Sequence, residues 1–156
     1  MKVLRSSKEK LVLQLSRQEK LLLIKILDLY PLVPSSYQQL SRTSETKDRE
    51  GSQRLLDEAL AEHRDANKRR LRQFLEDPKT FEKSQGACRM HLGQGDLEWL
   101  LQVLNDVRVG SWISLGSPEA KPPMLSHETT PQFWVMEIAG FLEASLVNAW
   151  DYDGGS

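Results

Sequence analysis

The sequence has few of the residues from which metal, redox or nucleophilic sites are built. It contains one cysteine, Cys88. A single thiol excludes an internal disulfide and any site with several thiolate ligands, and it fits a reducing cytoplasm. His63, His91 and His127 have no metal-ligand spacing, and the chain has no glycine-rich phosphate loop and no nucleophile beside a base. We therefore expect no metal and no cofactor, and an enzyme is the less favoured interpretation.

A surplus of charge of either sign is also absent. The formal net charge is -1, which argues against a general binder of nucleic acid or anionic membranes. The only basic cluster comprises Arg64, Lys68, Arg69, Arg70 and Arg72. Acidic residues are interspersed with it, so we expect a solvated helix face, and a patch for phosphate or an acidic partner is the alternative. No aromatic residue separates these bases, as a single-strand-binding surface would require.

Long uninterrupted apolar runs are missing as well. The most apolar stretch, 133–150, is interrupted by Glu137, Glu143 and Asn148. Its composition favours a core helix over a membrane span. The N-terminal residues MKVLRSSKEK are charged where a signal peptide becomes apolar. These patterns predict a cytoplasmic protein that does not associate with membranes.

The hydrophobic pattern predicts one mainly α domain over residues 1–156. With 156 residues, of which 39% are hydrophobic, the chain can bury a real core. We expect a compact bundle of about four main helices, at 17–30, 52–76, 96–116 and 131–150. Alternation at 2–5 and 10–15 predicts a small N-terminal hairpin or a two- to three-stranded sheet. An exposed connection near 35–51, a loop at 116–130 and a flexible tail at 151–156 complete the prediction.

Two parts of the chain resemble each other. VLQLSRQEKLLLIKIL (12–27) and RMHLGQGDLEWLLQVL (89–104) align without a gap, with Leu15 on Leu92 and Glu19 on Asp96. Each reads as a short strand, a turn and an apolar helix with an acidic first turn. In the first copy, Ser16 and Glu19 form a capping-box pattern. A structural repeat and a chance similarity are both open. A true repeat predicts that the two strands pair beside two related helices.

The stretch DLEWLLQVLNDVRVGSWISLG (96–116) is the most informative part of the sequence. A helical projection places Arg108 inside a wide apolar arc. A buried guanidinium requires a carboxylate, backbone carbonyls or an aromatic face. We expect Glu137 as the first candidate carboxylate and Glu143 as the second, with Trp112 as a cation–π partner.

Two interpretations of this polar set compete. In the first, Arg108 forms a structural lock with an internal acid, while Asn105 or Asp106 satisfies backbone groups at a helix end or loop. In the second, the same residues recognise a carboxylate or phosphate on a partner or ligand. The candidate site for either role consists of Asn105, Asp106, Arg108, Trp112 and Glu137.

The block Leu104-Asn105-Asp106-Val107-Arg108, followed by Leu115-Gly116 and a Trp- and Leu-rich final helix, resembles a bacterial family. It is the domain-of-unknown-function family numbered two thousand and seventeen, and the resemblance covers mainly residues 92–150. It implies a small, soluble, helical protein with no assigned activity and no catalytic residues to carry over. Some members are encoded near the adaptor of the Clp protease, which implies a regulatory or proteostasis setting.

These observations predict a protein-interaction or regulatory module. Its partner would be another protein or a second copy of the chain. Two alternatives stay open. One is a nucleic-acid-associated regulator that uses the basic helix face from Arg64 to Arg72. The other is an enzyme with a site around Asp106 and Arg108.

Overall fold

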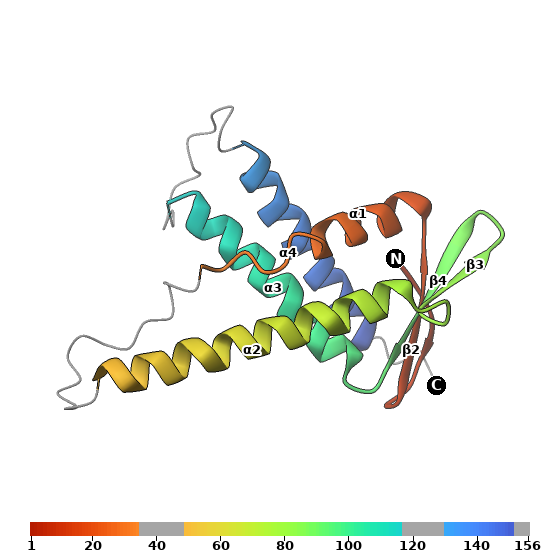
Figure 1. Cartoon of the computed structure of the whole chain (residues 1–156). Helices are drawn as coiled ribbons and strands as arrows, with labels where there is room; N and C mark the ends of the chain where they lie inside the picture. The colour runs from red at the N-terminus through yellow and green to blue at the C-terminus, as the bar shows by residue number, and fades with distance from the viewer. Residues whose placement is uncertain (35–48, 117–129, 152–156) are drawn as a thin grey trace.

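The computed structural model describes residues 1–34, 49–116 and 130–151 (Figure 1). In chain order the elements are β1 (Lys2–Ser6), β2 (Lys10–Leu15), α1 (Arg17–Leu27), α2 (Arg49–Glu76), β3 (Phe81–Ser84), β4 (Ala87–Gly93), α3 (Asp96–Ser114) and α4 (Thr130–Asp151). Most of the expected connection at 35–51, the loop at 116–130 and the tail at 151–156 lies outside the described residues, as does His127.

The four strands form one antiparallel sheet in the order β1-β2-β4-β3. The expectation of a mainly α bundle with a small hairpin or two- to three-stranded sheet is therefore wrong, and the fold is mixed α/β. The sequence analysis missed β3, whose residues are Phe-Glu-Lys-Ser. This strand is short, polar and at a sheet edge, so its extended conformation depends on pairing with β4 rather than on an apolar alternation of its own.

One face of the sheet carries the core. Leu11, Leu13, Leu15, Met90 and Leu92 are fully buried on it, and the register pairs Leu13 with Met90 and Leu11 with Leu92. Helices α1, α3 and α4 pack over this face (Figure 1). Helix α3 lies at the centre of the helical layer and buries one side against the sheet and another against α4. Its wide apolar arc, with exposed polar residues mainly on the remaining side, is the reason for this central position.

The predicted pairing of the two repeated strands is confirmed, because β2 and β4 are antiparallel neighbours. The two hairpins also share one register: Arg5 faces Val12 in the first, and the matched Glu82 faces Arg89 in the second. The fold therefore contains two ββα units, β1-β2-α1 and β3-β4-α3, joined at the middle of one sheet.

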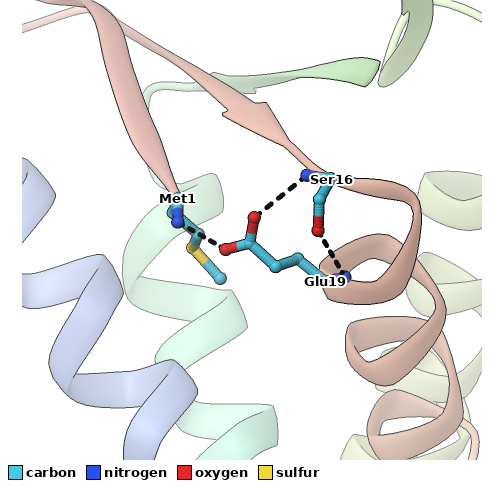
Figure 2. A network of polar contacts seen from close by, with 3 residues as sticks. All are labelled: Met1, Ser16 and Glu19. Atoms are coloured by element: carbon cyan, nitrogen blue, oxygen red, sulfur yellow. Dashed lines mark hydrogen bonds and ion pairs between the residues drawn. The ribbon is translucent and has the colours of Figure 1, made fainter. Parts of the chain in front are cut away.

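The predicted capping box at the start of α1 is confirmed (Figure 2). Ser16 Oγ accepts the amide of Glu19 at 3.1 Å, and Glu19 Oε1 accepts the amide of Ser16 at 3.0 Å. The other oxygen of Glu19 accepts a hydrogen bond from the Met1 amino group. Burial alone would raise the pKa of Glu19, but these hydrogen bonds bring it below its ordinary value. The second unit repeats one contact, since Asp96 Oδ2 accepts the amide of Gly93 at 2.7 Å.

Helix α2 runs across α3 and ends beside the sheet (Figure 1). Leu71 and Phe74 anchor its C-terminal half in the core, and the Phe74 ring meets Trp99 of α3 edge to face, with 5.4 Å between ring centroids. Helix α1 ends at Leu27 rather than at the expected Tyr30. The cause is Pro31, which disfavours a helical conformation at the residue before it.

Candidate functional site

A groove between α3 and α4, which we call the α3–α4 groove, contains three of the five candidate residues. Its volume is about 640 Å³, and its lining is mainly apolar. Arg108, Trp112 and Glu137 lie in it, and the other lining residues are Val109, Met136, Gly140 and Phe141. The structure therefore brings Arg108, Trp112 and Glu137 together, whereas Asn105 and Asp106 do not line this groove.

The expectation that Arg108 is a buried cation is wrong. The side chain of Arg108 is 48% exposed. The aliphatic part of Arg108 lies against α4 at Gly140, where an added Cβ would make an ordinary contact with Arg108 Cδ at 3.6 Å. The guanidinium stays in water, as long basic side chains commonly do.

The buried member of the pair is Glu143, the second of the two expected carboxylates. Its side chain is 17% exposed, and its Oε2 lies 3.8 Å from Arg108 Nη1, beyond hydrogen-bond distance. Among the described residues, Glu143 Oε1 is buried and accepts no hydrogen bond. Burial raises the pKa of Glu143, and the positive charge of Arg108 offsets part of that shift. Glu137, the first expected carboxylate, is exposed.

Two large aromatic side chains stand exposed on α4, one of them in the wall of the groove. Phe141 lines the groove and is 64% exposed, and Trp134, two helical turns earlier, is 56% exposed. Residues seven apart lie on nearly the same side of a helix, so these rings share one face. Large exposed aromatic side chains on one helix face are candidates for an interaction surface.

Asp106 and Asn105 do not belong to this groove. Asp106 Oδ1 accepts the backbone amides of Leu32 at 2.7 Å and Val33 at 3.3 Å. This contact matches the structural interpretation, in which Asp106 satisfies backbone groups of a loop. Asn105 is exposed on α3. Asp106 lines a small pocket of about 140 Å³ with Tyr30 and His63, whereas Arg108 opens into the α3–α4 groove.

The basic face of α2 is partly occupied by internal contacts. Arg64 Nη2 donates to the carbonyl of Val33 at 2.5 Å. Arg70 pairs with Asp96 at 3.1 Å and lies over the Trp99 ring, 4.5 Å from its centroid. Lys68, Arg69 and Arg72 are exposed. Two members of the cluster therefore hold α2 to the rest of the fold.

Sequence reasoning missed the path of residues 31–34 over α3. A Cβ on Gly110 would lie 2.4 Å from Leu32 Cβ and 2.6 Å from the Leu32 carbonyl carbon, so this glycine permits the crossing. The signal in the sequence is Asp106 followed one turn later by Gly110: an acceptor and then a gap on the same side of a helix. Neither Asp106 nor Gly110 by itself shows which segment of the chain crosses the helix at this place.

No family model, curated protein or solved structure matches this chain. The resemblance of residues 92–150 to the bacterial family of unknown function therefore stays a prediction. Within 1–34, 49–116 and 130–151, no helix combines the length and apolar character needed to cross a membrane. In the same ranges, no three His, Cys, Asp or Glu side chains are grouped as metal ligands would be.

Proposed function

We propose that this chain is a protein-interaction module. Its α3–α4 groove binds an apolar segment of a partner protein, and Arg108 binds a carboxylate carried by that segment. The observation that carries the proposal is the position of Arg108, half exposed in an apolar groove and 3.8 Å from Oε2 of Glu143. The proposed setting is cytoplasmic, which the single buried thiol of Cys88 supports.

The shape of the groove favours a peptide segment as occupant. An open groove of about 640 Å³ between two helices, with Trp112, Met136 and Phe141 as apolar walls, suits side chains projecting from one face of an amphipathic helix. Exposed aromatic residues such as Trp134 and Phe141 are typical of the residues that dominate binding energy at interfaces.

The charges favour a segment with one acid. Because its Oε2 lies 3.8 Å from Arg108 Nη1, beyond hydrogen-bond distance, Glu143 competes weakly for the guanidinium. Arg108 thus retains donors for a two-pronged contact with an incoming carboxylate. Glu137 is exposed in the same groove and repels further negative charge. The favoured ligand therefore carries one carboxylate within an apolar stripe, rather than an acidic run.

The two other expected functions receive less support. An enzyme centred on Asp106 and Arg108 would need both groups in one cavity, but they open into different pockets. A nucleic-acid regulator using the face from Arg64 to Arg72 would lose two of its cations to Val33 and Asp96. A second copy of the chain is a different occupant of the same groove, and the experiment below distinguishes it.

The test begins with selection of a displayed library of random helical peptides on the monomeric wild-type chain. The selected peptides are then titrated into wild type, Arg108→Gln and Arg89→Gln. Arg89 is an exposed arginine on β4 outside the groove and serves as the matched control. Light scattering behind a sizing column reports the oligomeric state of each variant.

We expect enrichment of apolar peptides with one Asp or Glu. Arg108→Gln should weaken their binding about tenfold, in line with a charged hydrogen-bonded pair, and Arg89→Gln should leave it unchanged. Selected peptides without an acid, bound equally well by Arg108→Gln, would contradict the proposal. If the wild type forms a dimer and Phe141→Asp converts it to a monomer, the occupant of the groove is a second copy of the chain and not a partner protein.

A further inference from the structure

A second concave site is formed by residues distant in sequence from those of the α3–α4 groove. It lies between the start of α1 and the turn of the second hairpin. We call it the basic pocket. Its volume is about 430 Å³. Three cations line it: Arg17 and Lys20 on the first turns of α1, and Lys83 at the end of β3. The remaining lining residues are Ser84, Gln85, Gly86, Ala87 and Cys88.

Among residues 1–34, 49–116 and 130–151, no carboxylate lines this pocket. The two acids nearest in sequence are engaged elsewhere. Glu19 is turned toward Ser16 and the Met1 amino group (Figure 2), and Glu82 lies 3.0 Å from His91 Nε2. Within the described part of the chain, no acid lies within 4.0 Å of any of the three cations. Lys20 Nζ instead lies over the Phe81 ring, 5.1 Å from its centroid.

The repeat within the fold provides an internal comparison. The alignment of Leu15 with Leu92 places Arg17 on Gln94 and Lys20 on Leu97. Gln94 and Leu97 line a pocket of about 460 Å³, together with Lys8 from the turn of the first hairpin. The same architecture thus forms a pocket in each unit, but only the one at α1 places two helical cations there. The cations are therefore not a requirement of the ββα fold.

Backbone and side-chain polarity reinforce the positive charge. The N-terminal end of α1 contributes the positive end of a helix dipole to this region. Ser84 and Gln85 add neutral hydrogen-bonding side chains, and Gly86 allows the turn by adopting φ 72°. A dianion bound in the pocket would pair with cations that no described acid approaches within 4.0 Å, and binding to the folded state would stabilise the folded chain.

We propose that the basic pocket binds the phosphate group of a small phosphorylated molecule. A phosphate dianion matches three converging cations better than a single carboxylate does, and arginine and lysine are the usual phosphate ligands. A volume of about 430 Å³ is in the range of small-molecule sites. This site is independent of Arg108, so its test does not depend on the proposed function of the groove.

The experiment is a titration of the isotopically labelled full chain followed by amide chemical shifts. The probes are inorganic phosphate and phenyl phosphate, with sodium chloride at matched ionic strength as the ion control. Two variants copy the second unit, Arg17→Gln and Lys20→Leu, and Lys83→Gln tests the hairpin side. Lys25→Gln changes an exposed lysine of α1 that does not line the pocket.

We expect saturable shifts for Arg17, Ser84 and Gly86 with a phosphate probe and not with chloride. Each pocket variant should weaken binding by about fivefold, the scale of a partly exposed charge pair, and Lys25→Gln should leave it unchanged. If phenyl phosphate binds more tightly than inorganic phosphate, the site is assigned to a phosphate ester. If the two probes bind equally well, it is assigned to free phosphate. Shifts that chloride reproduces, or that survive the combined Arg17→Gln and Lys20→Leu change, would overturn the proposal.

Discussion

Asp106 and Leu32 are 74 residues apart in sequence, yet Asp106 Oδ1 accepts the Leu32 amide at 2.7 Å. The same oxygen accepts the Val33 amide at 3.3 Å. Residues 31–34 lack regular secondary structure, so their amides need such partners when they are covered by other parts of the chain. One carboxylate thus fastens the segment after α1 across α3.

Replacement of Asp106 by alanine should destabilise the chain by about 1–3 kcal/mol, because two partly buried amides lose their acceptor. Asp106→Asn keeps an oxygen in place and should cost less than half as much. Urea unfolding followed by circular dichroism measures both free energies of unfolding. Equal losses for the two variants would mean that the charge of Asp106, not the hydrogen bonds, is the important contribution.

The two glycines that face neighbouring elements on α3 and α4 should respond in opposite ways to alanine. Gly110→Ala places a methyl group 2.4 Å from Leu32 Cβ and against its backbone, and should cost about 1–3 kcal/mol. Gly140→Ala meets only Arg108 Cδ at 3.6 Å and should be neutral or stabilising by about 0.5–1 kcal/mol. Thermal unfolding compares them directly, and a stable Gly110→Ala would argue against the close crossing.

Glu143→Gln should alter the pH dependence of stability. Because burial raises the pKa of Glu143, the folded chain keeps this proton to a higher pH than the unfolded chain does. Ionisation of Glu143 therefore lowers the free energy of unfolding as pH rises from its unfolded pKa through its folded pKa. At neutral pH the glutamine variant should be more stable by on the order of 1 kcal/mol.

This advantage should vanish in acid, below the ordinary carboxyl range, where Glu143 is protonated in both the folded and unfolded chains. Denaturant unfolding across the pH range measures it. Glu137→Gln, which removes an exposed carboxyl from the same helix, is the matched control. A constant difference between Glu143→Gln and wild type at all pH values would contradict the shifted pKa.

Local signals in the sequence predicted the parts of the fold that depend on neighbouring residues. The Ser16–Glu19 capping box, the strand at 10–15 and the strand-to-helix repeat all rest on contacts within a few residues, and the structure agrees with each. The burial in β2 does not alternate strictly, because Val12 is buried between Leu11 and Leu13. The edge strand β3 was not predicted, because its conformation depends on pairing with β4. Extending the repeat toward the N-terminus places Glu82 on Arg5, and this would have indicated the strand.

The error at Arg108 has a different origin. An expectation drawn from a helical projection assumes that every residue within the apolar arc of α3 is covered by another part of the chain. Near its C-terminal end α3 packs beside α4 at Gly140, and the side chain of Arg108 there is 48% exposed. Of the five residues grouped as one candidate site, Arg108, Trp112 and Glu137 line the α3–α4 groove, and Asn105 and Asp106 do not. Which carboxylate pairs with Arg108 depends on residues of α4 that lie 29 or more positions later, and it is the half-buried Glu143.

The central claim is that Arg108 binds a carboxylate carried by an apolar segment in the α3–α4 groove. A double-mutant cycle tests it most directly: titration calorimetry on wild type and Arg108→Gln, each with a selected peptide and with the same peptide carrying an amide in place of its acid. We predict a coupling of about 1 kcal/mol or more between the two changes. Additive effects, with no coupling, would contradict direct recognition of the carboxylate by Arg108.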